Sequence, residues 1–147
     1  EDANNNSITQ LSTNVELVVS TPTDTLTGTA AADTLTGGAA DEVIDGGQGA
    51  DTISTGGGTD KVVIRAGDGA STVATTNTIS DFTDGVDIFQ LNDGLTFADL
   101  TIATDTTTPA NAVVSTGTGS TTEYLMVVAD VAASALTDDD FVVSDIA

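Results

Sequence analysis

A nine-residue spacing of acidic and aliphatic residues dominates the first half of this chain. Acidic residues recur nine apart at Asp24, Asp33, Glu42, Asp51 and Asp60. An aliphatic residue follows each of them by two places, at Leu26, Leu35, Ile44, Ile53 and Val62. A period of nine fits neither one helix nor one strand, but it fits a six-residue turn joined to a three-residue strand with one inward aliphatic residue. The sequence therefore predicts an all-β coil of stacked repeats.

Glycines lie between the acidic and aliphatic positions in loose register, including Gly28, Gly37, Gly46, Gly49 and Gly58. Residues 46–54 read GGQGADTIS, which fits the pattern G-G-x-G-x-D-x-U-x. Glycine permits positive φ angles and lets backbone carbonyl groups approach a cation closely. Calcium takes roughly six to eight oxygen ligands, so a loop with one carboxylate cannot complete a site alone. We therefore expect two loops to share each ion.

On these residues the chain resembles the RTX (repeats-in-toxin, hemolysin-type) family of calcium-binding proteins. The resemblance implies a parallel β-roll in which two nonapeptides complete one coil, so that repeats n and n+2 stack. Asp33 is then expected to share a calcium ion with Asp51, and Glu42 with Asp60. Asp24 lacks the glycines, and we expect it to close a weaker site or only to cap the roll. Taken alone, any one Gly-Asp turn would favour a solvated turn without a ligand.

The nine-residue period breaks after Val62. The next glycine turn is displaced by two residues. If Gly69 takes the fourth place of the pattern, Ser71 replaces the expected aspartate and Val73 takes the aliphatic position. This substitution puts a calcium site in that loop in doubt, although Asp68 remains a candidate ligand.

The segment that follows also resembles the RTX family. Residues 79–91 read ISDFTDGVDIFQL, similar to the I-x-D-F-x-x-G-x-D-x-I segment that follows the roll in RTX proteins, with Ile88 or Phe89 at the closing apolar position. The resemblance implies that Asp81 caps the last metal column. It also implies that Phe82 covers the end of the core.

The rest of the chain reads as short strands and turns. β-branched residues predict strands at 15–20, 100–104, 112–115, 122–128 and 141–143, and alanine predicts a short helix at 129–136. Residues 1–14 are polar and read as an arm without periodicity. We divide the chain into an N-terminal arm and strand at 1–18, the β-roll with its closing segment at 19–91, and a β-rich C-terminal cap at 92–147.

The charge of the chain restricts its partners. The formal net charge is −21, from 23 acidic residues against two bases, Lys61 and Arg65. Such an excess opposes compaction unless a cation neutralises it. Several calcium ions fit that need, whereas nucleic acid and anionic membranes are repelled. The longest apolar run, residues 125–136, is interrupted by Asp130 and Ser134, so no membrane span is expected.

The residue types argue against an enzyme. The sequence contains no histidine and no cysteine, which excludes Ser-His-Asp and zinc-protease arrangements, cysteine nucleophiles and disulfides. Carboxylates are abundant, so an acid-pair glycosidase stays open by residue type. However, there is no tryptophan and only one tyrosine, Tyr124, for stacking on a sugar. We predict no enzymatic activity, no catalytic residue and no cofactor other than Ca2+.

Two functions fit this sequence. The first is a secreted, extracellular structural protein of a surface layer or filament, because the Thr/Ala-rich, Lys-poor composition resembles that of surface-layer proteins with RTX segments. Self-association would then use calcium and strand pairing by residues 15–20, unless that strand folds back on its own roll. The alternative is a C-terminal calcium-binding and secretion module of a larger RTX hydrolase or adhesin. Residues 140–143 are similar to the acid-plus-three-apolar ending of RTX proteins exported by type I secretion, and a first residue of Glu1 indicates a processed product or a fragment.

Overall fold

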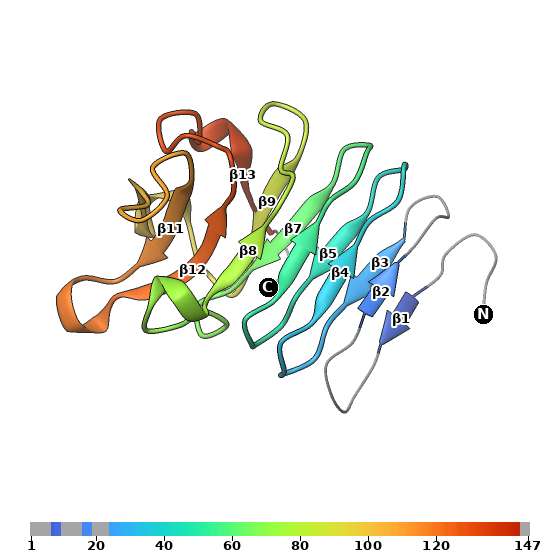
Figure 1. The fold of residues 1–147 in the computed structure, drawn as a ribbon, viewed down its shortest axis with the longest axis horizontal. Helices are drawn as coiled ribbons and strands as arrows, with labels where there is room; N and C mark the ends of the chain where they lie inside the picture. The colour runs from blue at the N-terminus through green and yellow to red at the C-terminus, as the bar shows by residue number, and fades with distance from the viewer. Residues whose placement is uncertain (1–6, 10–15, 19–23, 145–147) are drawn as a thin grey trace.

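Short strands arranged in two sheets build this chain (Figure 1). The computed structural model describes the backbone of residues 7–9 and 16–18 and all of residues 24–144. Within these residues there is no α-helix, and four short 3-10 turns occur: η1 (Val73–Thr75), η2 (Phe97–Asp99), η3 (Gly119–Thr121) and η4 (Asp138–Asp140). The predicted all-β class with parallel sheets is confirmed. No helix in the described part is long and apolar enough to cross a membrane.

The two sheets share the strands of the roll between them. The six-stranded sheet has the order β1 (Ser7–Thr9), β3 (Thr25–Thr27), β5 (Val43–Asp45), β7 (Lys61–Ile64), β9 (Ile88–Leu91) and β13 (Phe141–Val143). The seven-stranded sheet has the order β10 (Leu100–Thr104), β11 (Ala112–Thr116), β12 (Glu123–Val128), β8 (Asn77–Ile79), β6 (Thr52–Ser54), β4 (Thr34–Thr36) and β2 (Glu16–Val18).

Successive strands of the roll alternate between the sheets, so two nonapeptides complete one coil. Leu26 pairs with Ile44 in one sheet, and Leu35 pairs with Ile53 in the other. All pairs within the roll are parallel. The predicted stacking of repeats n and n+2 is therefore confirmed, and residues with the same place in the repeat lie above one another.

The coil extends further toward the N-terminus than the sequence analysis proposed. Strand β1 pairs with β3 through Ile8 and Leu26, and β2 pairs with β4 through Leu17 and Leu35. The interpretation of residues 1–14 as an arm without periodicity is therefore wrong for residues 7–9. The predicted strand at 15–20 is present as β2, paired with its own roll, while residues 15, 19 and 20 lie outside the described residues.

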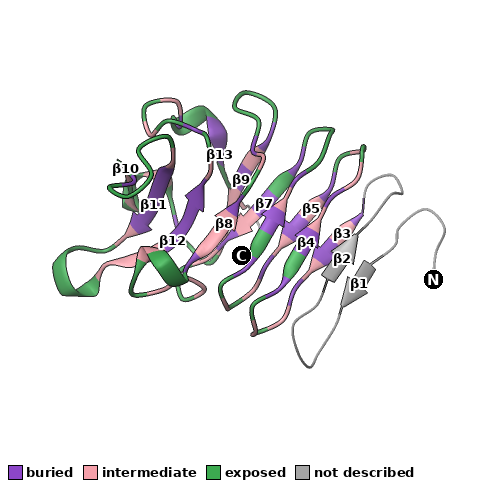
Figure 2. Ribbon diagram, in the orientation of Figure 1, coloured by how far each residue is buried: buried purple, intermediate pink, exposed green. Residues whose placement is uncertain are grey.

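One inward aliphatic residue from each three-residue strand forms the core of the roll, because side chains alternate across a strand, and the four-residue β7 adds a second one at Ile64. Leu26, Leu35, Ile44, Ile53 and Val62 are at most 2% exposed (Figure 2). In β4 and β6, for example, the first residue is exposed, the second is buried and the third is half-buried. A core of single aliphatic layers buries little apolar surface per residue. Interactions in the turns must therefore contribute much of the stability of the fold.

The C-terminal half closes one end of the roll. Strands β10, β11 and β12 form an antiparallel meander, and β12 joins β8 in parallel. At the same end Phe82 stacks on Phe89 at a centroid distance of 4.3 Å, and Phe141 lies 5.2 Å from both Phe89 and Phe97. Phe82 thus covers the end of the core as expected, and Phe89, not Ile88, is the buried closing residue. The proposed limits of the three segments remain a prediction.

Two local predictions in this half are wrong. Residues 129–136 form turns instead of a helix, because Asp130 has a φ of 56° and interrupts a right-handed helix. Val131 and Leu136 are buried in the core from these turns. The predicted aliphatic rung at Val73 begins η1, and Ile79 takes the inward place in β8.

Candidate metal centre

Each acid of the nine-residue ladder immediately precedes a strand, so strand pairing stacks the acids in two columns. The Asp51 column contains Asp33 and Asp51, before β4 and β6. The Asp60 column contains Asp24, Glu42 and Asp60, before β3, β5 and β7. All five residues are at most 3% exposed. The structure thus brings together the pairs that the sequence analysis expected to share ions.

Hydrogen bonds connect the levels of both columns. The backbone N–H of Asp33 donates to Oδ1 of Asp51 at 2.9 Å, and the N–H of Glu42 donates to Oδ1 of Asp60 at 2.7 Å. The Oδ1 atoms of Asp51 and Asp60 therefore hold adjacent coils together. The Oδ2 atoms of these two residues do not take part in these bonds.

Two residues that the sequence analysis missed extend these columns. The N–H of Asp51 donates to Oδ1 of Asn77 at 2.9 Å, and the N–H of Asp60 donates to Oδ1 of Asp87 at 3.1 Å. Both follow the rule of the ladder, because they precede the inward residues Ile79 and Phe89 by two places. The assignment of Ser71 to the acidic position is therefore wrong. The turn before β8 is longer than the others and ends in an amide.

Three buried carboxylate oxygens have no hydrogen-bond partner in the described structure: Glu42 Oε1, Asp51 Oδ2 and Asp60 Oδ2. In the neighbouring turn Asp33 Oδ2 accepts the N–H of Thr29 at 2.5 Å. The equivalent donors before Asp51 and Asp60 are turned elsewhere, since Gly47 N–H donates to Asp45 and Gly56 N–H donates to Asp81. A buried oxygen without a partner is costly, and a bound cation would supply that partner.

Burial makes ionisation of these acids unfavourable in the absence of a cation. It raises the pKa of Asp51 to about 7, with further increases from the charges of Asp33, Asp68 and Asp45. Burial likewise raises the pKa of Asp60 to about 6, with the charges of Asp87 and Glu42 adding to the effect. The pKa of Glu42 is raised by the same cause. A cation at these oxygens would reverse the shifts.

The glycines leave room for carbonyl oxygens of the adjacent coil. A Cβ atom at Gly49 would lie 2.5 Å from Ala31 O, and one at Gly46 would lie 2.5 Å from Asp51 Oδ2. At Gly28, Gly37 and Gly58 a Cβ atom would collide with the carbonyl oxygens of Gly46, Thr55 and Ala40. Gly49 and Gly58 also have positive φ angles of 118° and 110°. Each turn therefore brings backbone oxygens to the carboxylate columns.

This donor set fits a hard, oxygen-seeking cation. Among the residues that the structure describes, no group of three or more acidic side chains is placed so that its members could hold one metal ion together. A site must therefore combine one or two carboxylates with carbonyl oxygens, which is a combination that calcium accepts. The buried oxygens without partners lie in the turns of residues 37–42, 46–51 and 55–60.

The remaining predicted ligands lie at different places. Asp24 is buried in the Asp60 column, and its carbonyl oxygen accepts the N–H of Val43 at 2.9 Å. Asp81 lies at the start of the turn before Asp60, where it accepts the N–H groups of Thr55 at 2.6 Å and Gly56 at 3.1 Å. Burial opposes its ionisation, but these bonds and that of Ser54 together lower the pKa of Asp81. Asp68 lies outside both columns and pairs with Arg65 at 3.3 Å.

Comparison with known proteins identifies the repeats. The profile of the RTX calcium-binding nonapeptide repeat matches four copies, in residues 23–53 and 36–73. The AlgE6R3 subunit of the Azotobacter vinelandii mannuronan C5-epimerase has a similar fold, with a TM-score of 0.64 and 21% identity over 88% of this chain and 78% of that one. The AlgE6R2 subunit of the same enzyme gives a TM-score of 0.56 and 18% identity, covering 83% of this chain and 94% of that one. No curated protein sequence matches this chain significantly. The recognition of RTX repeats is confirmed, and calcium is the metal that such repeats bind.

The raised pKa values make the metal-free fold sensitive to pH. Asp51 keeps its proton up to about pH 7 in the folded chain, but in the unfolded chain it ionises near its ordinary value of 3.8. The folded state therefore binds more protons between these values, and its stability falls as the pH rises. We expect the β-sheet signal in circular dichroism, measured in chelator, to decrease between about pH 4 and pH 7. Asp51→Asn should extend the folded range upward by about half a pH unit or more.

The matched control for this measurement is Asp139→Asn, which changes an exposed acid by the same charge. It should leave the pH midpoint near that of the unaltered chain. Equal midpoints for the two variants would contradict the assignment of the pH response to the buried carboxylate.

Proposed function

We propose that the RTX nonapeptide repeats of residues 23–73 make this chain an extracellular structural module that folds when it binds calcium outside the cell. The observation that carries this proposal is the set of buried carboxylate oxygens without partners, at Glu42, Asp51 and Asp60. At neutral pH and above, their burial is favourable only when a cation is present. Calcium therefore controls whether the coil forms.

The charge and the core of the chain support calcium-dependent folding. A net charge of −21 with two bases places like charges at the spacing of the coils. Each three-residue roll strand offsets this repulsion with one inward aliphatic residue, as Ile44 and Ile53 show. Extracellular calcium modules bind at about 10⁻⁴ to 10⁻³ M, well above resting intracellular calcium. The chain would therefore remain loose inside a cell and order itself outside.

The acids of the two columns are the residues that would hold the ions. One ion would lie between the turns of residues 28–33 and 46–51, with Asp33 and Asp51 as its carboxylates. A second would lie between the turns of residues 37–42 and 55–60, with Glu42 and Asp60. Asp87 and Asp81 offer further oxygens at the next level of the Asp60 column, because both contact the hydroxyl of Thr55 at 3.1 Å.

Calcium titration followed by circular dichroism tests this function. The chain should gain β-structure as calcium is added at neutral pH and lose it again with chelator. Asp51→Asn should raise the calcium concentration at half-folding by about tenfold or more, the loss expected for a charged oxygen ligand. The same variant stabilises the metal-free chain in the pH experiment, so its two effects have opposite sign. A spectrum independent of calcium, or a half-folding concentration equal to that of Asp139→Asn, would remove the proposal.

Export of an unfolded chain is compatible with folding that requires calcium. The segment 140–143, similar to the ending of type I secreted RTX proteins, contains the last residue of η4 and all of β13 in the folded chain. Phe141 is buried and packs against Phe89, whereas Val142 and Val143 are 37% and 51% exposed. An exporter would therefore read this segment before the cap folds. Low intracellular calcium would leave it available.

Substitutions at the exposed valines test the export segment without disturbing the core. Val142→Asp combined with Val143→Asp should keep the chain inside a producing cell that carries a type I exporter. Val86→Asp is a matched control, because Val86 is 41% exposed and lies outside the segment. The measurement is the amount of protein in the medium relative to the cells. Equal release of both variants would argue against a signal at residues 140–143.

Self-association is the second part of the structural proposal, and the direction of the sheet favours it. All six strands of the β1–β13 sheet are parallel, with β1 at one end and β13 at the other. Strand β1 of a second copy would therefore continue the same order beside β13. A head-to-tail contact of this kind does not close and produces filaments.

A proline in the edge strand tests this assembly. Ser144 N–H donates inward to Leu91 O at 2.8 Å, so the N–H of Val143 points away from β9 because donors alternate along a strand. Val143→Pro should therefore stop polymer formation in millimolar calcium, as followed by light scattering and negative-stain microscopy. Val143→Ala should assemble normally. A chain that stays monomeric without any substitution would end this part of the proposal.

The fold also supports the alternative that the module serves within a larger protein. Both similar structures are subunits of a mannuronan C5-epimerase. In such a setting this chain would bind calcium while another domain performs the chemistry. The mass of the natural polypeptide, measured on secreted material, separates a self-standing structural protein from a module of a larger one.

A further inference from the structure

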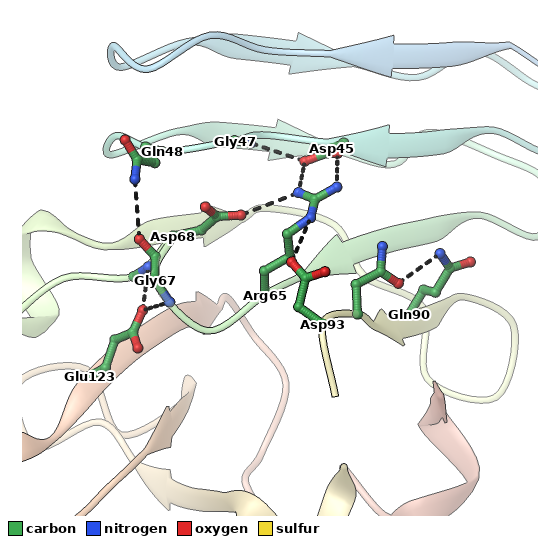
Figure 3. Close-up of polar contacts among 11 residues, drawn as sticks. Asp45, Gly47, Gln48, Arg65, Gly67, Asp68, Gln90, Asp93 and Glu123 are labelled. Atoms are coloured by element: carbon green, nitrogen blue, oxygen red, sulfur yellow. Dashed lines mark hydrogen bonds and ion pairs between the residues drawn. The ribbon is translucent and has the colours of Figure 1, made fainter. Parts of the chain in front are cut away.

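Arg65 contacts three carboxylates at the point where the regular roll ends (Figure 3). Its Nη2 and Nη1 atoms lie 2.5 and 2.8 Å from the two oxygens of Asp45. Nη1 also lies 3.3 Å from Asp68 Oδ2, and Nε lies 3.6 Å from Asp93 Oδ2. A planar guanidinium with a bidentate partner is held firmly in place. One side-chain cation therefore serves three acids.

The three acids come from different levels of the structure. Asp45 is the last residue of β5, Asp68 follows β7 by four residues, and Asp93 follows β9 by two residues. Arg65 itself is the first residue after β7. The turns of the Asp51 column begin at the ends of β5 and β7. The guanidinium thus connects adjacent coils on the same side of the roll as that column.

The Asp51 column changes its chemistry at this level. Arg65 stands eighteen residues after Gly47, one coil length on, where the preceding coils begin a glycine turn. The following turn ends in Asn77, so an amide replaces the acid. Two of the acids that surround Asp51, namely Asp45 and Asp68, are the acids that Arg65 holds. Positive charge is present here without a metal.

The turn that follows Arg65 also joins the roll to the cap. Gly67 and Gly69 donate their N–H groups to Glu123 Oε1 at 2.7 and 2.8 Å. Ala70 and Tyr124 exchange two backbone hydrogen bonds of 2.8 Å. The pair between Arg65 and Asp68 therefore anchors a turn that lies directly on β12.

We propose that Arg65 supplies a permanent positive charge in the place of a metal ion at the last level of the Asp51 column, and so joins the roll to its cap without calcium. The proposal has two consequences. Loss of the guanidinium leaves Asp45, Asp68 and Asp93 facing one another, which weakens the joint. Asp45 and Asp68, the two acids that contact Nη1, then become the carboxylates of a position that a calcium ion can fill together with carbonyl oxygens.

The test compares Arg65→Ser with Lys61→Ser. Lys61 is the second base of the chain, is exposed, and makes no ion pair among the described residues, so both variants change the net charge equally. In calcium that just saturates the unaltered chain, Arg65→Ser should lower the urea midpoint by about 0.5 M or more relative to Lys61→Ser. Native mass spectrometry in excess calcium should count one additional ion in Arg65→Ser and none in Lys61→Ser. Equal urea midpoints would overturn the proposal, and so would an unchanged ion count in Arg65→Ser if the unaltered chain binds calcium.

A second substitution keeps the test decisive if Arg65→Ser fails to fold. Asp45→Asn removes the acid that contacts both guanidinium nitrogens, so the double variant Arg65→Ser/Asp45→Asn should regain most of the lost urea midpoint. Failure of the double variant to recover would show that Arg65 does not act through charge compensation. The inference uses calcium binding for its ion count only. If the chain binds no calcium, the proposed function fails, while the urea midpoints of the single and double variants still decide the role of Arg65.

Discussion

The neutralisation of buried carboxylates between stacked coils is the constraint on which this fold depends. Each ladder acid immediately precedes a strand, so the hydrogen bonds that form the sheets also bring the acids together. Asp33 N–H lies 2.9 Å from Asp51 Oδ1 as a direct result. Because each three-residue roll strand adds one inward aliphatic residue, apolar burial alone offers little against this repulsion. We therefore expect folding and cation binding to be coupled in the repeats.

The two columns end in different ways, and the difference determines how the cap attaches. The Asp60 column passes to a further carboxylate at Asp87, next to Asp81 and the phenylalanine cluster. The Asp51 column passes to the amide of Asn77, with the guanidinium of Arg65 beside it. One roll thus contains carboxylates that need a metal ion, the amide of Asn77 that needs none, and the positively charged side chain of Arg65. The need for metal therefore decreases toward the cap in the Asp51 column, but not in the Asp60 column.

The sequence predicted the regular part of the roll well because every residue there has one role that repeats. Prediction failed where the coil length changes. The inward position of Ile79 and the column position of Asn77 can be assigned only when the length of the turn before β8 is known. It also missed β1, where Ile8 continues the aliphatic ladder without the glycines and acids that marked the other repeats. The helix expected at 129–136 failed for another reason. Alanine propensity is weak beside the turn at Asp130 and the burial of flanking apolar residues.

The spacing of the acids could not predict which carboxylate oxygens lack a hydrogen-bond partner, because this depends on where the backbone N–H groups of the turns point. Asp33 and Asp51 occupy the same place in the repeat, yet Thr29 donates to Asp33 while Gly47 donates to Asp45. In the other column Gly56 donates to Asp81, and an oxygen of Asp60 is left without a partner. Acids outside the ladder thus take the amides of the glycine turns. Their presence leaves ladder oxygens buried and unsatisfied, which is the condition that a calcium ion relieves.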